Sequence, residues 1–453
     1  MKNSLIKDKP FKALLLFALP MILSVTLQQF YNICDSMIAG KFVGHNGLAA
    51  VSASYPITMI YLAIGTGFGI GTNIVAARFI GEGNNGYAKK SIYTSILTIV
   101  LVGVFVSILG LIFVKNLITL IKVSGDYYND AVIYLRYYTY GIIFMFLYNV
   151  VTSSFQAIGN SRIPLYFLIF STILNIVLDI WFVTSFNMGV EGLALATFLS
   201  QVIASLASFL VLIIYIRKYV SKEKKVVDFK ILKPVIEIGL PSILQSSTIS
   251  IGQLLIQSLI NAQGSIVVAG YGAAYKLVYV VINIFATISN ALSTYVSQNA
   301  GAKEFTRIKQ GFKSGLIICA VLTVVTTILF LTLSDTLLKI FENEDDPKEV
   351  IEVGNLFIKT LAPFIFFMAI KIPCDGVLKG SEDMLGFVLG TMLDLAVRVI
   401  CSFILVKVLG VKGIFLSWPI GWGVGAISSV ICYIFGRWKK LIGATQDTQL
   451  CQN

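Results

Sequence analysis

Five polar side chains recur along the first long apolar segment of this chain. They are Ser24, Gln28, Tyr31, Asn32 and Asp35. Their spacing of three and four residues would gather them in one stripe on a helix. Asp35 is the only charged residue in the segment 13–39. An acid in the middle of a membrane helix costs roughly 2.5–3.5 kcal/mol, so it is expected to face a polar cavity or a partner. We interpret Asp35 as part of an ion-coupling site; the alternative is an acid held in the lipid headgroup region.

A second set of polar residues follows in two later apolar segments. Asn175 and Asp179 are four residues apart, and Thr197 and Gln201 have the same spacing. At 1.5 Å per residue, Asp35, Asp179 and Thr197 lie about 33, 24 and 12 Å along their segments, which places all three in the outer half of a membrane. Two carboxylates, an amide oxygen and a hydroxyl suit Na⁺ or a shared proton. The alternative is that Asn175 and Asp179 only bond neighbouring helices.

The composition indicates an all-α polytopic membrane protein. Of 453 residues, 57% are hydrophobic and 13% are charged, against about 25% charged residues in soluble domains. Apolar runs of 20 or more residues recur along the chain. The net charge of +12 comes from basic residues that sit largely in short connections between these runs, so it does not indicate nucleic-acid binding.

Twelve spans are predicted, and the distribution of Lys and Arg sets their direction. The spans are 13–39, 48–77, 91–114, 132–157, 163–186, 189–216, 235–261, 266–296, 311–333, 350–377, 384–408 and 413–436. Basic residues concentrate at the N-terminus and in alternate connections, above all in 217–233. By the positive-inside rule both termini are cytoplasmic. We expect a multi-pass protein of the cell (inner) membrane.

Three short motifs repeat at nearly constant offset. Ala18-Leu19-Pro20 matches Gly239-Leu240-Pro241 at an offset of 221, and a motif after span 2 and one after span 4 recur at offsets of 220 and 221. The repeat predicts two pseudo-symmetric six-helix bundles related by an axis along the membrane normal. The predicted parts are an N-terminal bundle 1–216, a basic linker 217–234, a C-terminal bundle 235–440 and a cytoplasmic tail 441–453.

The acids are not repeated. At the offset of 221, Asp35 corresponds to Ile256 and Asp179 to Ile400, so ion coupling is expected in the N-terminal half. The C-terminal half instead carries Lys276 and two pairs of opposite charge, each with a spacing of four residues. The pairs are Lys371 with Asp375, expected near the membrane interface, and Asp394 with Arg398, expected to pair along one helix.

Other motifs exclude some functions and predict local packing. The chain has no P-loop and no soluble domain large enough for a nucleotide, so it is expected to be no enzyme and to use an ion gradient. No cofactor is expected beyond the coupling ion, H⁺ or Na⁺. In span 2, Gly65, Gly67, Gly69 and Gly71 form overlapping G-x-x-x-G spacings, which favour close helix packing or a flexible segment.

These features together resemble the multidrug and toxic compound extrusion (MATE) family. The resemblance rests on the Leu-Pro steps at Pro20 and Pro241 and on three segments that begin at Arg78, Gln156 and Leu174. It covers nearly the whole chain and is greatest with the prokaryotic branch whose cation site lies in the N-terminal half. It implies alternating access between two six-helix bundles and export of amphipathic, typically cationic, organic compounds in exchange for H⁺ or Na⁺.

The resemblance also assigns roles to individual residues. The cation site, which would be a metal site if the ion is Na⁺, matches Asp35, Asn175, Asp179 and Thr197, with Tyr31 beside it. A substrate cavity would be lined by Gln28, Asn32, Gln201, Gln253, Lys276 and Arg398. Another branch of the family uses acids in the C-terminal half, where this chain offers only Asp375. The expected partners are a small-molecule substrate and the lipid bilayer, without nucleic acid or nucleotide, and the protein is expected to be a monomer.

Two other functions remain open at this stage. A flippase for a lipid-linked intermediate would need several buried Lys or Arg side chains facing the cleft, for which Lys276 and Arg398 are the candidates. A membrane scaffold or receptor would lack coupled acids in its spans and would carry a sizeable soluble domain, and the chain has neither feature.

Overall fold

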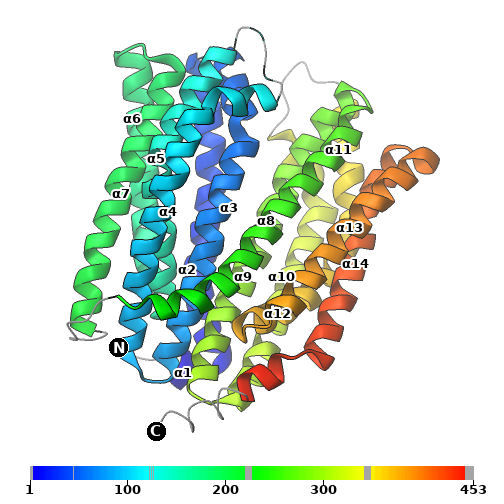
Figure 1. Cartoon of the computed structure of the whole chain (residues 1–453). Helices are drawn as coiled ribbons and strands as arrows, with labels where there is room; N and C mark the ends of the chain where they lie inside the picture. The colour runs from blue at the N-terminus through cyan, green and yellow to red at the C-terminus, as the bar shows by residue number, and fades with distance from the viewer. Residues whose placement is uncertain are drawn as a thin grey trace. The chain divides into compact units, whose positions relative to one another are not determined.

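The computed structural model is helical throughout the residues that it describes, which are 4–43, 45–121, 123, 125, 127–219, 227–340 and 348–443. Figure 1 labels the helices along the chain. In the first half they are α1 (Ser4–Lys7), α2 (Pro10–Ile38), the π-helical turn η1 (Ala39–Val43), α3 (His45–Gly81), α4 (Asn85–Leu120), α5 (Tyr128–Ala157), α6 (Arg162–Ser185) and α7 (Gly189–Tyr219). In the second half they are the 3₁₀ turn η2 (Phe229–Ile231), α8 (Leu232–Asn261), α9 (Ser265–Gly301), α10 (Phe305–Lys339), α11 (Lys348–Leu361), the 3₁₀ turn η3 (Ala362–Phe364), α12 (Phe366–Gly380), α13 (Met384–Leu409) and α14 (Val411–Phe435).

The lengths and composition of these helices confirm the predicted fold class. Within the described residues, ten helices are long and apolar enough to cross a membrane, and α11 with α12 makes an eleventh span. The twelfth is α13, which has 26 residues and carries Asp394 and Arg398 in its middle. Each half of the sequence therefore contributes six spans.

The fourth span of each half is built differently. In the first half α5 is one continuous helix of 30 residues. In the second half the predicted span 350–377 is bent, because the chain turns by 59° between α11 and α12. The bend falls at η3, whose Pro363 has no amide hydrogen to continue an α-helix.

Contacts between residues divide the chain into two compact units. One contains Leu19–Ser247, and the other contains Ser4–Ala18 together with the chain from Thr248 onward. The helices α2 and α8 each contribute residues to both units. The predicted division at 217–234 stays a prediction. Residues 220–226 of that linker and 444–453 of the predicted tail lie outside the described residues.

In the first unit, the glycines of α3 allow two helices to approach its backbone from different sides. A methyl group on Gly65 would lie 3.0 Å from the ring of Phe146 in α5, and one on Gly69 would meet α5 at Asn149 and Ser153. A methyl group on Gly67 or Gly71 would instead collide with α8, where Gly239 lies opposite. The predicted close packing of the G-x-x-x-G spacings is confirmed. The helices α4 and α7 also pack against α5, and α4 contacts α3 as well (Figure 1).

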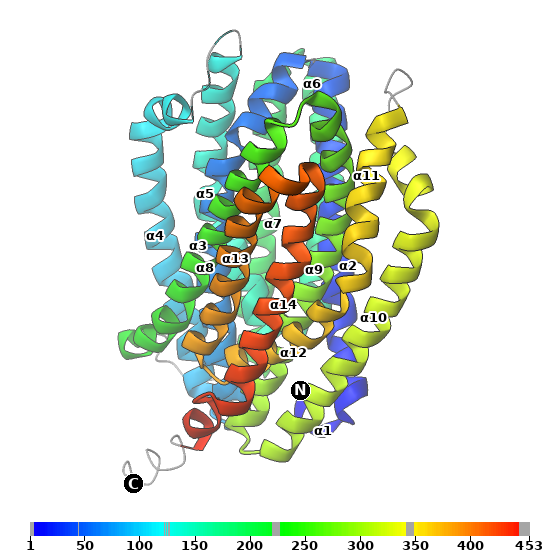
Figure 2. The same cartoon turned by 90° about the vertical axis from the view of Figure 1, so that its right-hand side faces the viewer.

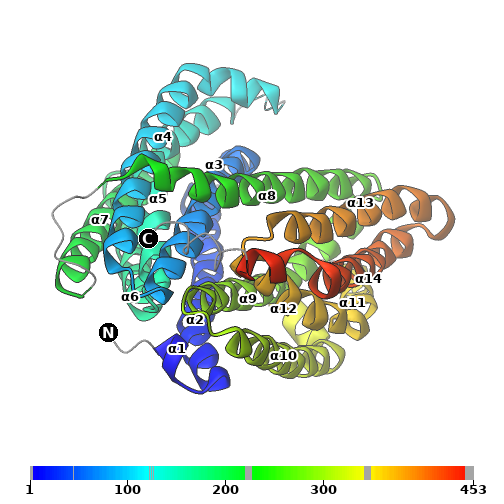
Figure 3. The ribbon, with the colours of Figure 1, turned by 60° about the horizontal axis from the view of Figure 1, so that its bottom comes forward.

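In the second unit, the short helix α1 packs against α9 (Figure 3). The guanidinium group of Arg307 holds it there, because Nη2 donates hydrogen bonds to the carbonyl oxygens of Leu5 at 3.2 Å and Asp8 at 2.7 Å. The buried amide of Asn299 donates to the same Leu5 oxygen at 3.1 Å. The helices α13 and α14 run side by side in this unit (Figure 2).

Candidate functional site

Two polar side chains of α6 are buried in the first unit. Asn175 is 2% exposed and Asp179 is fully buried, although the other face of α6 is apolar and exposed at Ile173 and Val177. A helix places residues four apart on the same face, so the local sequence alone puts the amide and the carboxylate one above the other. The face that they share turns toward α2 and α7.

The amide of Asn175 joins four of the predicted site residues. With the amide oriented so that both of its polar atoms are satisfied, Nδ2 donates to Asp179 Oδ2 at 2.9 Å and to Tyr31 Oη at 3.3 Å. In the same orientation, Asn175 Oδ1 accepts a hydrogen bond from the backbone N–H of Thr197 at 3.2 Å. The side chains of Thr197 and Tyr31 are also hydrogen-bonded to each other. The helices α2, α6 and α7 therefore meet at Asn175.

Asp35 completes the set on α2. It stands one turn beyond Tyr31 and is half-buried, and it lies close enough to Asp179 and Tyr31 to interact electrostatically with both. The second carboxylate oxygen of Asp179, Oδ1, is buried and has no hydrogen-bond partner among the described residues. Neither acid forms an ion pair within the described residues. The described part of the chain thus offers no Lys or Arg that would hold either acid in its ionised form.

An apolar cluster covers one end of this polar set. Ile38, Val183 and Leu193 pack together and are buried. They lie one turn from Asp35, Asp179 and Thr197, respectively. The π-helical turn η1 adds Val43 to the same cluster. Because the cluster excludes water from this side, the electrostatic interactions among the acids are stronger than they would be in solution.

The structure adds Tyr134 of α5, which the sequence analysis missed. Its side chain is 9% exposed, and it interacts electrostatically with Asp35 and Asp179. It packs on Val190 and Ala194 at the start of α7. Several tyrosines stand close together in α5, and nothing in their spacing distinguishes Tyr134 from Tyr137 or Tyr138. Its deeper burial distinguishes it, because Tyr137 and Tyr138 pack against the same cluster and are only partly buried.

The residues predicted to line a substrate cavity belong to different units. Gln28, Asn32 and Gln201 are in the first unit, where Gln28 and Gln201 are half-buried and Asn32 is exposed. In the second unit, Gln253 is half-buried and Lys276 is exposed. The amide of Gln253 donates to Tyr271 Oη at 2.9 Å. Their role as a cavity stays a prediction.

Arg398, also predicted to line the cavity, lies in the second unit. Its side chain contacts residues of its own helix, α13, and of α14. Its Nη2 donates to Asp394 Oδ1 at 2.5 Å, which confirms the expected pair. Its guanidinium group also lies over the ring of Trp418, 4.4 Å from the ring centre.

The expected pairing of Lys371 with Asp375 is confirmed, and its position near the membrane interface stays a prediction. Nζ lies 2.6 Å from Oδ2, and the pair is buried, since Lys371 is 8% and Asp375 3% exposed. The helices α13 and α14 pack over α12 and cover it. Position along the chain indicates depth along a helix, and it does not show which face the neighbouring helices cover.

The chemistry of the acid set fits a hard cation or a proton. Asp179 Oδ1, the carboxylate of Asp35 and the hydroxyl of Thr197 are oxygen ligands of the kind that Na⁺ takes, and a carboxyl group can also carry a proton. No cluster of three or more His, Cys, Asp or Glu side chains that could hold a metal occurs in the described part of the chain. The set is therefore suited to reversible binding of a monovalent ion, with few charges around it.

Comparisons with known proteins agree with this architecture. The family model MatE matches the chain twice, over residues 20–181 and 241–404. The two matches begin 221 residues apart (241 − 20), which is the offset of the internal repeat. The probable multidrug resistance protein YoeA of Bacillus subtilis (strain 168) is 27% identical over 98% of this chain and 97% of its own length. The probable multidrug resistance protein YpnP of the same organism is 26% identical over 95% and 96%.

A solved structure has the same fold. It is the outward-facing conformation of a multidrug resistance MATE family transporter of the MOP superfamily, with a TM-score of 0.89, 23% identity and coverage of 99% of both chains. Twelve spans in two repeated halves and a match to both halves define a multi-span membrane transporter of small molecules. The chain belongs to the MatE family, the multidrug and toxic compound extrusion transporters. Members of this family are transporters and not enzymes.

Proposed function

We propose that this protein is a secondary active antiporter that exports amphipathic, cationic organic compounds in exchange for H⁺ or Na⁺. The observation that carries the proposal is the buried, unpaired carboxylate of Asp179, whose Oδ1 has no partner among the described residues. Burial of an ionised carboxylate without a partner is costly, so the group gains stability when it takes up a cation or a proton. Asp35, whose charge acts on the same site, doubles the negative charge available.

Ion binding at these acids would drive transport through a difference in affinity between conformations. The site is built from three helices, α2, α6 and α7, so a shift of one helix changes the distances among Tyr31, Asn175 and Thr197. A conformation that separates them binds the ion less tightly. The ion-bound and ion-free proteins then favour different conformations, and the ion gradient sets which form prevails when the site opens to each side of the membrane. This difference in affinity is what couples the ion to the exported compound.

The relatives support drugs as the class of substrate. YoeA and YpnP are described as probable multidrug resistance proteins. Amphipathic organic cations are the compounds that such a transporter would carry. We further propose that the protein acts as a monomer in the cell membrane with both termini in the cytoplasm, and that it uses no nucleotide.

The alternative of a flippase for a lipid-linked intermediate is less well supported. That function needs uncompensated cations, whereas two of the buried cations in the second unit are neutralised. Lys371 is paired with Asp375 at 2.6 Å and Arg398 with Asp394 at 2.5 Å. An anionic headgroup would have to compete with these internal carboxylates.

Transport in proteoliposomes tests the proposal. Purified protein is reconstituted, and uptake of labelled tetraphenylphosphonium is measured under an imposed pH gradient and, separately, an imposed Na⁺ gradient. Uptake driven by one of the gradients is expected for the unaltered chain and is expected to be lost in Asp35→Asn and in Asp179→Asn. Glu191→Gln is the matched control, because this acid of α7 is exposed and bonds Tyr137 Oη at 2.6 Å instead of the acid set. Unchanged gradient-driven uptake in both Asp variants would refute the proposed coupling.

A further inference from the structure

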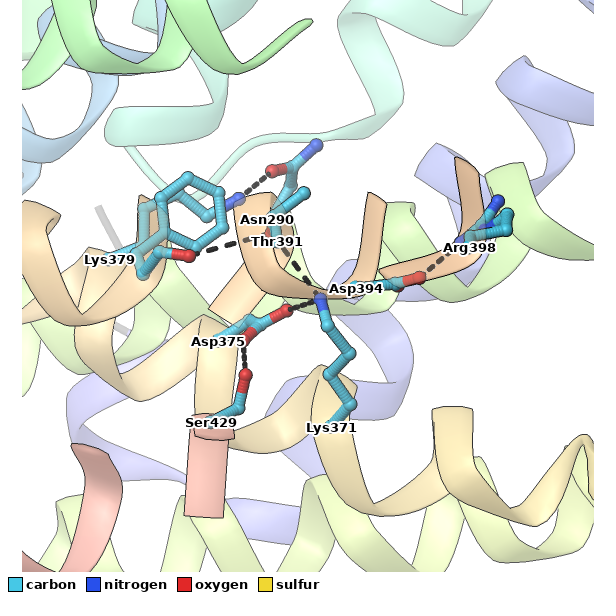
Figure 4. Close-up of polar contacts among 9 residues, drawn as sticks. Asn290, Lys371, Asp375, Lys379, Thr391, Asp394, Arg398 and Ser429 are labelled. Atoms are coloured by element: carbon cyan, nitrogen blue, oxygen red, sulfur yellow. Dashed lines mark hydrogen bonds and ion pairs between the residues drawn. The ribbon is translucent and has the colours of Figure 1, made fainter. Parts of the chain in front are cut away.

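The second unit contains a buried ammonium group surrounded by oxygen atoms. Lys371 Nζ lies 2.6 Å from Asp375 Oδ2 and 3.4 Å from Thr391 Oγ1. Figure 4 shows the lysine of α12 directed at these two groups, with Asp394 of α13 beside them. The charge of Asp394 also acts on the ammonium group. All four residues are less than 10% exposed.

The oxygens around Lys371 are themselves held in place. Asp375 Oδ1, the oxygen that does not face the lysine, accepts a hydrogen bond from Ser429 Oγ of α14 at 2.7 Å. Asp394 Oδ1 accepts from Arg398 at 2.5 Å (Figure 4). The carboxylate of Asp375 is thus fixed from two sides, by α14 and by its own helix, with one oxygen directed at the cation.

Glycines of α13 and α14 let this cluster close around the ammonium group. A methyl group on Gly425 would lie 2.8 Å from Asp394 Cβ and 3.0 Å from Lys371 Cε. A methyl group on Gly421 would lie 2.8 Å from Asp394 Oδ1, and one on Gly390 would overlap Ser429 Oγ. Close approach of the helices therefore leaves the lysine side chain little freedom to leave its position.

We propose that Lys371 is a tethered cation: its ammonium group fills, in the C-terminal half, a position between Asp375 and Thr391 that would otherwise bind a small cation. The surrounding carboxylate and hydroxyl oxygens are the ligands that Na⁺ also takes. A covalently attached cation cannot exchange with solution. The second unit then contributes no ion to the transport cycle, although it contains buried acids.

The contrast with the first unit shows what the lysine changes. Asp179 is as deeply buried as Asp375, but it has an oxygen without a partner and no ammonium group beside it. Asp375 has a partner on each oxygen. Removal of the Lys371 side chain would leave an empty space beside the buried carboxylate of Asp375, and a small cation would fill that space. This inference uses contacts of the second unit only, and it holds whether or not Asp35 and Asp179 couple ions to export.

Thermal unfolding of Lys371→Ala tests the inference. The variant is made in a chain that also carries Asp35→Asn and Asp179→Asn, so that any cation effect arises outside the first unit. Unfolding midpoints in detergent are measured in choline chloride and with added NaCl or methylammonium chloride at constant ionic strength. We expect a lower midpoint in choline and a rise of a few degrees with methylammonium, Na⁺ or both, because a ligand that binds only the folded state stabilises it. The parent chain with Lys371 should show no such rise.

Two further variants keep the test decisive. Lys371→Ala combined with Asp375→Asn should lose the dependence on small cations, since the carboxylate that attracts them is gone. Lys371→Gln retains most of the side-chain volume and should respond to Na⁺ in the same direction if Lys371→Ala proves too unstable to purify. The inference is overturned if the unfolding midpoints of Lys371→Ala and of Lys371→Gln, each without Asp375→Asn, do not change when small cations are added. A cation response that persists when Asp375→Asn is added would also overturn it. Failure of both Lys371 variants to fold, even in about 0.5 M methylammonium chloride, would overturn it as well.

Discussion

In α6, the amide nitrogen of Asn175 lies 2.9 Å from Oδ2 of Asp179 when the amide is oriented to satisfy both of its polar atoms. The two residues are one turn apart and both are buried. This bond leaves Oδ1 of the acid as the atom that faces the rest of the site without a partner. The amide therefore decides which carboxylate oxygen is left for an ion.

Replacement of Asn175 by Ala should strengthen binding of the coupling ion at Asp179 without abolishing transport. The amide donates to the ionised carboxylate and so stabilises the ion-free state. Loss of this bond, which contributes about 1.5–3 kcal/mol, should lower the ion concentration for half-maximal transport by roughly 10- to 150-fold. The measurement is uptake of tetraphenylphosphonium as a function of the ion that drives it. Asn283→Ala serves as the control, because the Asn283 amide donates to the carbonyl oxygen of Tyr279 in its own helix. Equal ion dependence in the two variants would show that Asn175 only packs helices.

Tyr134→Phe should alter the ion dependence of transport more than Tyr138→Phe does. The Tyr134 side chain is buried near Asp35 and Asp179, so its hydroxyl contributes to the polarity of their surroundings. The hydroxyl of Tyr138 instead donates to Met145 Sδ at 3.4 Å, a weak bond. A several-fold change is expected, in keeping with about 0.5–1.5 kcal/mol for the loss of one neutral polar group. Ion titrations of transport in the two variants provide the comparison, and identical curves would remove Tyr134 from the site.

Asp394→Asn should destabilise the protein strongly, because it leaves Arg398 inside the second unit without its carboxylate. Loss of one partner of a buried pair costs about 3–5 kcal/mol. The combination with Arg398→Met should recover much of that loss, since no buried charge then remains. Lys233 and Glu237 form an exposed pair, 81% and 63% accessible in their side chains, so Glu237→Gln should cost at most about 1 kcal/mol. Unfolding midpoints of the three variants and the unaltered chain are measured in detergent, and a double variant no more stable than Asp394→Asn would contradict this expectation.

Gly71→Ala should destabilise the first unit, whereas Gly272→Ala should not. A methyl group on Gly71 would collide with the backbone carbonyl oxygen of Val235 and would lie 3.1 Å from the Gly239 nitrogen, and backbone atoms of α8 cannot rotate away as a side chain can. Nothing lies within 4 Å of the corresponding position at Gly272. Overpacking of this kind costs about 1–3 kcal/mol. A thermal midpoint of Gly71→Ala equal to that of Gly272→Ala would show that α3 and α8 separate at no cost.

Some of these features follow from local sequence. The helical spacing of Asn175 and Asp179 places them on one face whatever packs against it, and the G-x-x-x-G spacing in α3 requires neighbours at close range. The pairs Lys371–Asp375 and Asp394–Arg398 are four residues apart on their helices, so each partner is within reach of the other. The twelve spans and the internal repeat follow in the same way, from hydropathy and from matching motifs.

Other features depend on which helices meet. Nothing in the spacing of α5 singles out Tyr134, and only its deeper burial in the folded unit separates it from Tyr137 and Tyr138. The bend between α11 and α12 also depends on its surroundings, because a proline inside another helix of this chain, Pro20 in α2, leaves that helix continuous.

By itself, the sequence determined the helices, their repeat and the residues that share a helical face, because these depend on spacing of a few residues along one chain. Tertiary structure alone decided which of these groups are buried and which polar atoms find a partner on another helix. Lys371 is surrounded by oxygens from α12 and α13, while Asp179 keeps an oxygen without a partner among the described residues. The physical reason is that burial and contacts between helices depend on side chains brought together from different helices, and no spacing within one helix encodes them.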